Sequence, residues 1–316
     1  MKRKASAPQP KVVRTLVRHF RAQRPLRGGS LLITIFGDAI APRGGAVTLG
    51  SLIRLAAPFG LTERLVRTSV ARLARDGWLQ ARRSGRRSEY RLTRSGTERF
   101  AEATRRIYGT HPRSWSGIWT LLLLPERMRR PQQLRRELQW LGFGQLTPAL
   151  FAHPASTLRR AGRWLRGIAG TRGALLLAGR SGGAGADREL AARGWDADRQ
   201  ARRYRQLIAR FAAVAAAFAG GGVTPETAFV VRTLLIHEYR KIHLKDPQLP
   251  PALLPRDWAG RAAYRLCRAL YARTFLPAER HLSGCARRLR RPLPPANAAA
   301  RARFGGIAHR TPPVSS

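Results

Sequence analysis

The stretch of sequence that decides the fold is residues 62–93, which read TERLVRTSVARLARDGWLQARRSGRRSEYRLT. Val66, Val70 and Leu73 follow one another at spacings of four and three residues, so they share one face of a helix and predict that this face is buried. Arginines occupy the opposite face of the same helix. Apolar and polar residues then flank Gly85 on both sides, which predicts two short strands joined by a basic turn. The stretch therefore predicts a helix with an arginine-rich outer face, followed by a basic hairpin.

Two more helices are predicted upstream of this stretch. The run 31–40 is apolar on nearly every side, as a buried first helix would be, and Thr48 is suited to cap a second helix. Pro58 and Gly60 end that helix, so a short turn separates it from the arginine-bearing helix, which Thr62 can cap. Helices and hairpin in this order predict a winged helix-turn-helix, whose last helix enters the major groove of duplex DNA. A plain helical hairpin with solvated arginines is the alternative.

The side chains expected to contact DNA form two sets. Arg64, Arg67 and Thr68 face away from the buried stripe and are predicted to approach base edges, because arginine can donate two hydrogen bonds to guanine. The second set is predicted to hold phosphates or to enter the minor groove, and it consists of Arg72, Arg75, Arg82, Arg83, Arg86 and Arg87.

Bulk composition favours an anionic partner without locating its site. The chain has 60 lysines and arginines against 17 aspartates and glutamates, so its formal net charge is +43. Such a charge suits nucleic acid, an anionic membrane surface or a phosphate-bearing ligand. The excess is nearly all arginine and can partly reflect codon composition, because lysine occurs only at Lys2, Lys4, Lys11, Lys241 and Lys245.

Several classes of protein are disfavoured. Residues 1–10 are charged and contain no apolar core, so no secretory signal is visible, and the longest apolar run, 211–223, is too short to span a bilayer. Cys267 and Cys285 lack the CxxC spacing of a zinc site and do not indicate a disulfide framework. We therefore expect a cytoplasmic protein without membrane contact, metal or cofactor.

The pattern along the chain predicts an α+β, multidomain protein. A basic flexible arm at 1–27 precedes the winged helix-turn-helix domain at 28–108. Alternating strands and helices at 109–185 predict a ferredoxin-like central domain. Helical spacing at 186–285 predicts an all-helical C-terminal domain. Residues 286–316 are rich in arginine, proline and alanine without a core pattern, so we predict a disordered basic tail.

Short motifs recur in order along about residues 28–282. In the N-terminal part they are Ile35-Phe36-Gly37-Asp38, Pro42-Arg43-Gly44-Gly45, Leu49-Gly50-Ser51-Leu52-Ile53, Pro58-Phe59-Gly60, Glu63–Val70 and Gly85-Arg86-Arg87-Ser88. Further along they are Leu134–Leu138, Gly142-Phe143-Gly144, Ala152-His153-Pro154, Leu235–Arg240, Asp246-Pro247, Leu249-Pro250 and Leu253-Leu254-Pro255. In these motifs the chain resembles the PaaX family of transcriptional repressors of phenylacetic acid degradation operons.

The resemblance implies a transcriptional repressor. We interpret it as a homodimer, and two-fold symmetry then requires a near-palindromic operator in double-stranded DNA. The resemblance also implies release by an aryl-acyl-CoA effector, phenylacetyl-CoA, and a central domain that resembles the small CRISPR-associated nuclease fold. That fold does not by itself carry an activity, and no close pair of acidic residues is visible on the predicted central strands, so we expect no enzymatic activity.

Residues 237–258 hold the candidates for effector binding. A metalloprotease site is disfavoured, because His237 and His243 are six residues apart, whereas HExxH places its histidines four apart. An acyl-CoA needs cationic donors for its phosphates and an apolar slot for its acyl group. The predicted contacts are His237, Arg240, Lys241, His243, Lys245 and Trp258. The alternative is a helix-end network in which His237 and Glu238 hold the proline-rich loop that follows.

Two other functions compete with the repressor. One is a nucleic-acid-processing enzyme built on the central domain, which would cleave a duplex in the presence of a metal ion. The other is a nonspecific basic protein that coats DNA or RNA, with steep salt dependence and no preference for an operator.

Overall fold

The computed structural model describes residues 9–23, 28–85, 87–109, 114–125, 131–154, 156–166, 168, 171–289 and 291–306. Its helices are α1 Lys11–Ala22, α2 Gly28–Ile35, α3 Leu49–Ala56, α4 Glu63–Arg75, α5 Arg94–Tyr108, α6 Pro131–Trp140, α7 Leu158–Leu165, α8 Ala184–Gly194, α9 Ala197–Ala217, α10 Pro225–His243, α11 Ala259–Cys285 and α12 Ala298–Arg301. Its strands are β1 Ala46–Thr48, β2 Leu79–Ser84, β3 Arg87–Leu92, β4 Trp119–Leu123, β5 Gly144–Gln145, β6 Leu150–His153 and β7 Leu175–Gly179.

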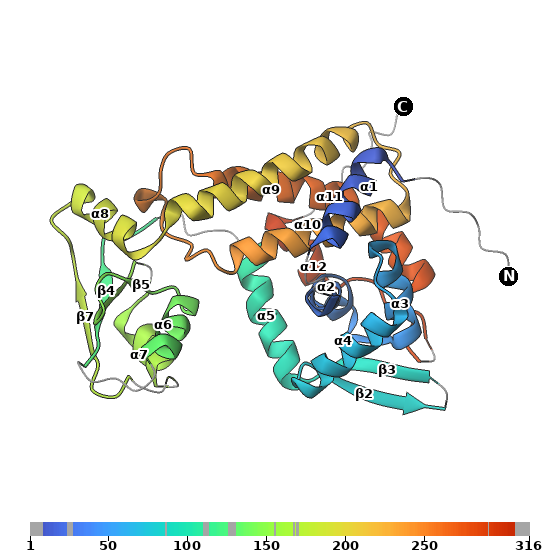
Figure 1. Cartoon of the computed structure of the whole chain (residues 1–316), viewed down its shortest axis with the longest axis horizontal. Helices are drawn as coiled ribbons and strands as arrows, with labels where there is room; N and C mark the ends of the chain where they lie inside the picture. The colour runs from blue at the N-terminus through green and yellow to red at the C-terminus, as the bar shows by residue number, and fades with distance from the viewer. Residues whose placement is uncertain are drawn as a thin grey trace. The chain divides into compact units, whose positions relative to one another are not determined.

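The chain forms two compact units (Figure 1). Unit 1 comprises Met1–Gly109, Gln206–Lys241 and Ala263–Ser316, and unit 2 comprises Thr110–Arg205 and Ile242–Ala262. The region 186–285 is mainly helical, as expected, but its residues are shared between the two units, because α9, α10 and α11 each cross a unit boundary. Within the described residues, no helix is both long enough and apolar enough to cross a membrane.

The N-terminal part of unit 1 contains the helices and the hairpin that the sequence predicts. The Thr62 hydroxyl accepts a hydrogen bond from the Leu65 amide at the start of α4, and Thr48 caps α3 in the same way. Val66 and Val70 are fully buried on the inner face of α4. Strands β2 and β3 pair antiparallel, and β1 adds to the free edge of β3, in the order β1-β3-β2. In Figure 1 the hairpin projects beside α4.

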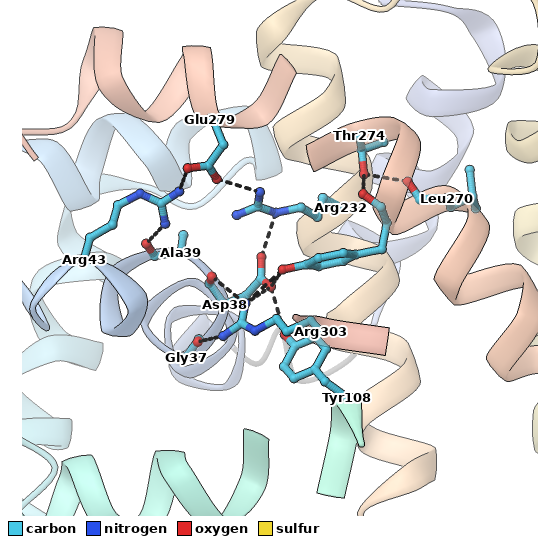
Figure 2. Close-up of polar contacts among 11 residues, drawn as sticks. Gly37, Asp38, Ala39, Arg43, Tyr108, Arg232, Leu270, Thr274, Glu279 and Arg303 are labelled. Atoms are coloured by element: carbon cyan, nitrogen blue, oxygen red, sulfur yellow. Dashed lines mark hydrogen bonds and ion pairs between the residues drawn. The ribbon is translucent and has the colours of Figure 1, made fainter. Parts of the chain in front are cut away.

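A buried polar network lies at the centre of unit 1 (Figure 2). Asp38, on the π-helical turn Phe36–Ile40, accepts hydrogen bonds from Tyr108 and Tyr271 at 2.8 Å each. The Arg232 Nε donates to Asp38 Oδ2 at 2.8 Å, and Arg303 donates to Asp38 Oδ1 at 2.9 Å. Burial alone would raise the pKa of Asp38, but the two arginines and the two hydroxyl donors hold it below its ordinary value. Asp38 is therefore ionised, and it joins the π-helical turn that follows α2 to α5, α10, α11 and the C-terminal segment.

The N-terminal arm is partly folded, and the prediction of a flexible arm over 1–27 is wrong for Lys11–Ala22. These residues form α1, which buries Val13, Leu16 and Phe20. The Phe20 ring packs edge-on against Phe59 at 6.4 Å between centroids. The spacing of three and four residues between the buried side chains was visible in the sequence, but the basic composition around them concealed it.

The predicted disordered tail is also folded over most of its described length. Arg287 forms a β-bridge with Pro292, and α12 and a 3-10 turn follow. Phe304 is 2% exposed and packs against the rings of Tyr108 and Tyr271, with centroids 5.2 and 5.3 Å away. Residues 307–316 lie outside the described part of the chain. The prediction failed because the segment has no local periodicity and is ordered by tertiary contacts instead.

Unit 2 contains the ferredoxin-like domain. The elements follow the order β4-α6-β5-β6-α7-β7, and the sheet order is β5-β6-β4-β7 with antiparallel pairing throughout. Helices α6 and α7 pack on one face through a core that includes Leu122, Leu138 and Phe151. Trp119 begins a second apolar cluster on the other face, together with residues of α8 and of the loop near Leu253. The prediction of a ferredoxin-like central domain is confirmed.

The stability of unit 2 is expected to depend on pH through His153. Burial against Phe143 and Trp164, opposed by a hydrogen bond to the Leu141 backbone and aided by the nearby charge of Arg160, lowers the pKa of His153 from 6.5 to about 4. Between these two values the unfolded chain binds a proton that the folded chain does not. The free energy of unfolding should therefore fall by about 3 kcal/mol as the pH is lowered through this window.

Urea unfolding between pH 7 and pH 4 measures this dependence. Tryptophan fluorescence reports mainly on unit 2, because Trp78 is the one tryptophan of the sequence outside it. A His153→Leu variant should lose most of the pH dependence in this window. Parallel pH profiles for the parent and the variant would rule out His153 as the cause.

Candidate nucleic-acid interface

Helix α4 presents one polar face to solvent. Arg64, Arg67, Thr68, Arg72 and Arg75 are all exposed, while Val66, Ser69, Val70 and Leu73 are buried on the opposite side. The N-cap at Thr62 and the acidic Glu63 in the first turn suit the positive end of the helix dipole. The outward direction expected for these side chains is confirmed, and their contact with DNA stays a prediction.

Two of these arginines already have acidic partners on their own helix. Arg67 donates to Glu63 at 2.6 and 2.8 Å, and Arg72 lies 3.8 Å from Asp76. Among the described residues, Arg64 and Arg75 have no ion-pair partner. Exposed pairs at this spacing contribute about 0.3–0.5 kcal/mol, so a phosphate or a guanine can displace Glu63 from Arg67 at little cost.

The hairpin carries the other predicted contacts. Three arginines of the hairpin are exposed, namely Arg82 and Arg83 on β2 and Arg87 at the start of β3. Ser84 and Arg87 are the last paired residues before the turn. Gly85 adopts a φ of 56°, which glycine tolerates and other residues rarely do. Arg86, also predicted to contact DNA, lies outside the described residues. The tip of the hairpin is thus basic on the strand that follows the turn as well as on the strand before it.

A hollow of about 720 Å³ lies beside α4, and we call it the basic groove. It is lined by the start of α3, by Arg67 and Arg87 of the predicted interface, and by the C-terminal residues Arg287–Leu289, Arg291 and Pro292. The C-terminal arginines of this groove are not among the contact residues that the sequence predicts. Their neighbours in the chain have no helical or strand periodicity that would have placed them next to α3 and β3.

The structure places His237 and Arg240 in the interior of unit 1, against α2. The Arg240 guanidinium donates to Thr34 Oγ1 at 2.8 Å and to the Ser30 carbonyl at 2.7 Å. His237 Nδ1 lies 3.0 Å from the same Thr34 hydroxyl. Burial, with Arg240 and Lys241 nearby, lowers the pKa of His237 well below its ordinary value, so the ring is neutral. Lys241 pairs with Glu238 at 3.3 Å.

The remaining effector candidates lie in unit 2. Tyr204 donates to Asp246 Oδ2 at 2.7 Å and lies 2.9 Å from His243 Nδ1, so the histidine is the donor in that second contact. Trp258 packs edge-on against Tyr204, with 6.0 Å between ring centroids. Lys245 is exposed. His243 and Trp258 thus belong to a network at the end of α10. The alternative interpretation had His237 and Glu238 hold the proline-rich loop, whereas the structure places His237 against Thr34 and pairs Glu238 with Arg210 and Lys241.

Within the described residues there is no group of three or more histidine, cysteine, aspartate or glutamate side chains placed to hold a metal ion. Cys267 is buried, and burial raises the pKa of its thiol above the ordinary value.

Similarity to known proteins extends over most of the chain from residue 27 to residue 284. Residues 27–96 match the model described as "PaaX-like protein", residues 112–191 match "PaaX protein central Cas2-like domain", and residues 195–284 match "PaaX-like protein C-terminal domain". The Transcriptional repressor PaaX of Escherichia coli (strain K12) is 36% identical over 266 residues, which are 82% of this chain and 84% of that protein.

A solved structure, the Uncharacterized protein Rv0674 from Mycobacterium tuberculosis, is 24% identical, with a TM-score of 0.47 over 73% of this chain and 91% of that one. The identity to the repressor extends over most of both sequences, and the three family matches follow one another in chain order. The chain belongs to the PaaX family.

Proposed function

We propose that this protein is a DNA-binding transcriptional repressor of phenylacetate catabolism genes. One observation carries the proposal: α4 presents an exposed row of arginines beside a basic hairpin, in a chain 36% identical over 82% of its length to a transcriptional repressor. A helix narrow enough for the major groove, followed by an arginine-tipped hairpin, is the arrangement of a winged helix-turn-helix. We assign that role to α3, α4, β2 and β3.

In this proposal the two sets of interface residues have different roles in DNA binding. Arg64, Arg67 and Thr68 approach base edges and carry sequence preference. Arg72, Arg75, Arg82, Arg83, Arg86 and Arg87 hold phosphates or enter the minor groove, so they supply affinity without sequence information. A homodimer would then bind a near-palindromic operator whose half-sites are spaced by about a helical turn or a multiple of it.

The exposed leucines of unit 2 support self-association. Leu175 and Leu177 on the edge strand β7 are 58% and 51% exposed, and Leu123, which pairs with Leu175, is 40% exposed. Scattered exposed leucines are ordinary, whereas neighbouring ones on a single sheet face mark interaction sites. We propose this face as a contact between two copies of the chain.

We propose phenylacetyl-CoA, or a related aryl-acyl-CoA, as the effector that releases the operator. His237, Arg240, Lys241, His243, Lys245 and Trp258 stay the predicted contact residues. The contact of Arg240 and His237 with Thr34 supports a role in coupling, because it joins α10 to α2 within unit 1. A ligand that favours another position of α10 would act on the DNA-binding helices through α2, and a coupling of about 1–3 kcal/mol weakens operator binding by 5- to 150-fold.

The test compares duplex DNA taken from upstream of the protein's own gene with scrambled duplex of equal length. The proposal predicts at least about 10³-fold tighter binding to the upstream DNA at physiological salt. Added phenylacetyl-CoA should weaken binding to the upstream DNA and leave binding to the scrambled DNA unchanged. Equal affinities would indicate a nonspecific coating protein, and metal-dependent cleavage of the labelled duplex would indicate an enzyme.

Arg67→Ala is the variant that tests the assignment of α4. It should lose operator preference while its thermal unfolding stays close to that of the parent, because the lost ion pair is exposed. Arg105→Ala on α5 is the matched control, since Arg105 is also exposed and pairs with a glutamate of its own helix. Gel shifts that show equal operator affinity for the parent and Arg67→Ala would contradict the assignment.

A further inference from the structure

The C-terminal segment is anchored directly to the proposed DNA-binding module. The Thr48 amide donates to the Arg287 carbonyl at 3.0 Å, and the Arg287 amide donates to Ser51 Oγ at 2.9 Å. The Leu289 amide donates to the buried carboxylate of Glu89 at 3.0 Å. Backbone hydrogen bonds thus fix this segment against the start of α3 and against β3, and its side chains are positioned as part of that surface.

The basic groove concentrates positive charge. Its lining includes arginines from α3, α4, β3 and the C-terminal segment, and these are Arg54, Arg67, Arg87, Arg287, Arg288 and Arg291. None of the described residues that line the groove is acidic. Glu89, which lies behind it, is 4% exposed and is already bonded to the Leu289 amide. Two of these six arginines have acidic partners, since Arg67 pairs with Glu63 and Arg288 lies 4.0 Å from Glu89. The positive charge of the groove is therefore only partly balanced, and the groove suits an anion from outside.

The N-terminal end of α3 also favours an anion in the groove. Leu49 and Gly50, the first two residues of the helix, line the groove. Backbone N–H groups and the positive dipole end of a helix favour phosphate at this position. The arginines and the helix start therefore select the same class of ligand.

We infer that the basic groove binds the phosphodiester backbone of duplex DNA and that Arg287 and Arg291 are phosphate contacts. The inference rests on the proposed function and extends its interface to a segment beyond the family-model matches, which end at residue 284. Duplex DNA is favoured over a small anion because Arg67 and Arg87 line the groove and also belong to the helix and hairpin proposed to meet the duplex. The groove lies beside the outer face of α4, so it supplies affinity and register without base preference.

The experiment measures the salt dependence of binding by a double variant, Arg287→Ala with Arg291→Ala, in the full-length protein. Both side chains are exposed, and the anchoring hydrogen bonds of the segment use backbone atoms, so the fold is retained. Arg265→Ala with Arg268→Ala is the control, because it removes the same charge from exposed positions of α11 that line a different hollow.

Each phosphate contact contributes about 0.9 to the slope of log affinity against log salt concentration. The Arg287/Arg291 variant should therefore have a slope shallower than that of the parent by about 1.8, with equal weakening on upstream and scrambled duplexes. The control should keep a slope close to that of the parent.

The outcomes separate this inference from the proposed function. A parent protein that binds no duplex would overturn both. A parent that prefers its upstream DNA, together with equal slopes for the two double variants, would overturn only the role of the groove. Equal duplex affinities for the parent and the Arg287/Arg291 variant, together with binding of millimolar inorganic phosphate by the parent but not by the variant, would assign the groove to a small anion instead.

Discussion

Asp38→Ala is expected to remove about 3–5 kcal/mol from the free energy of unfolding of unit 1. The carboxylate is 3% exposed and is the shared counter-ion of two buried arginines, Arg232 and Arg303. Removing it leaves these charges without their common partner and leaves two buried tyrosine hydroxyls without their acceptor. Since folded proteins are stable by about 5–15 kcal/mol, the loss is a large share of the total.

Thermal unfolding measures this effect. For a unit of this size, each kcal/mol shifts Tm by about 2–4 °C, so the expected decrease is about 6–20 °C. Asp76→Ala is the control, because it removes an exposed carboxylate at the end of α4. A Tm for Asp38→Ala within about 2 °C of the parent would show that the network contributes little to stability.

Asp38 also makes the free energy of unfolding of unit 1 depend on pH, and this free energy falls in acid. The pKa of Asp38 lies below its ordinary value of 3.8 in the folded protein, so the unfolded chain takes up this proton first. The stabilisation is complete above the ordinary pKa and is lost as the pH falls toward the folded value. In Asp38→Asn this part of the acid transition should be absent.

Ending the chain at Cys285 is expected to abolish the cooperative unfolding of unit 1. The deletion removes Arg303, which donates to Asp38 and to the Gly37 carbonyl, and it removes Phe304 from a cluster of tyrosine rings. Loss of a buried phenylalanine side chain alone costs about 3–5 kcal/mol. Together with the loss of a buried ion-pair partner, this approaches or exceeds the stability of an ordinary domain.

Circular dichroism melts and limited proteolysis of the truncated chain test this expectation. Phe304→Ala serves as a graded variant, with a predicted loss of about 3–5 kcal/mol and a retained cooperative transition. A truncated chain that unfolds at the parent temperature would restore the interpretation of residues 286–316 as a disordered tail.

Local pattern was sufficient for the elements of the candidate site. The caps at Thr48 and Thr62, the buried face of Val66 and Val70, and the exposed arginines of α4 all follow from short-range spacing. This works because capping and one-sided burial depend on residues within a turn or two of one another. The ferredoxin-like domain could be predicted for the same reason, since its strands and helices alternate over short distances in the sequence.

Only the tertiary structure decided the roles of residues whose partners are distant in sequence. Asp38 meets Arg232 and Arg303, Arg240 meets Thr34, and the segment at Arg287 meets Thr48. The spacing of residues within one segment does not predict such contacts, because each polar group finds its hydrogen-bond or ion-pair partner on an element from another part of the chain. The sequence by itself thus determined the helix–hairpin module with its outward arginines, while packing decided that the final basic segment is folded beside it.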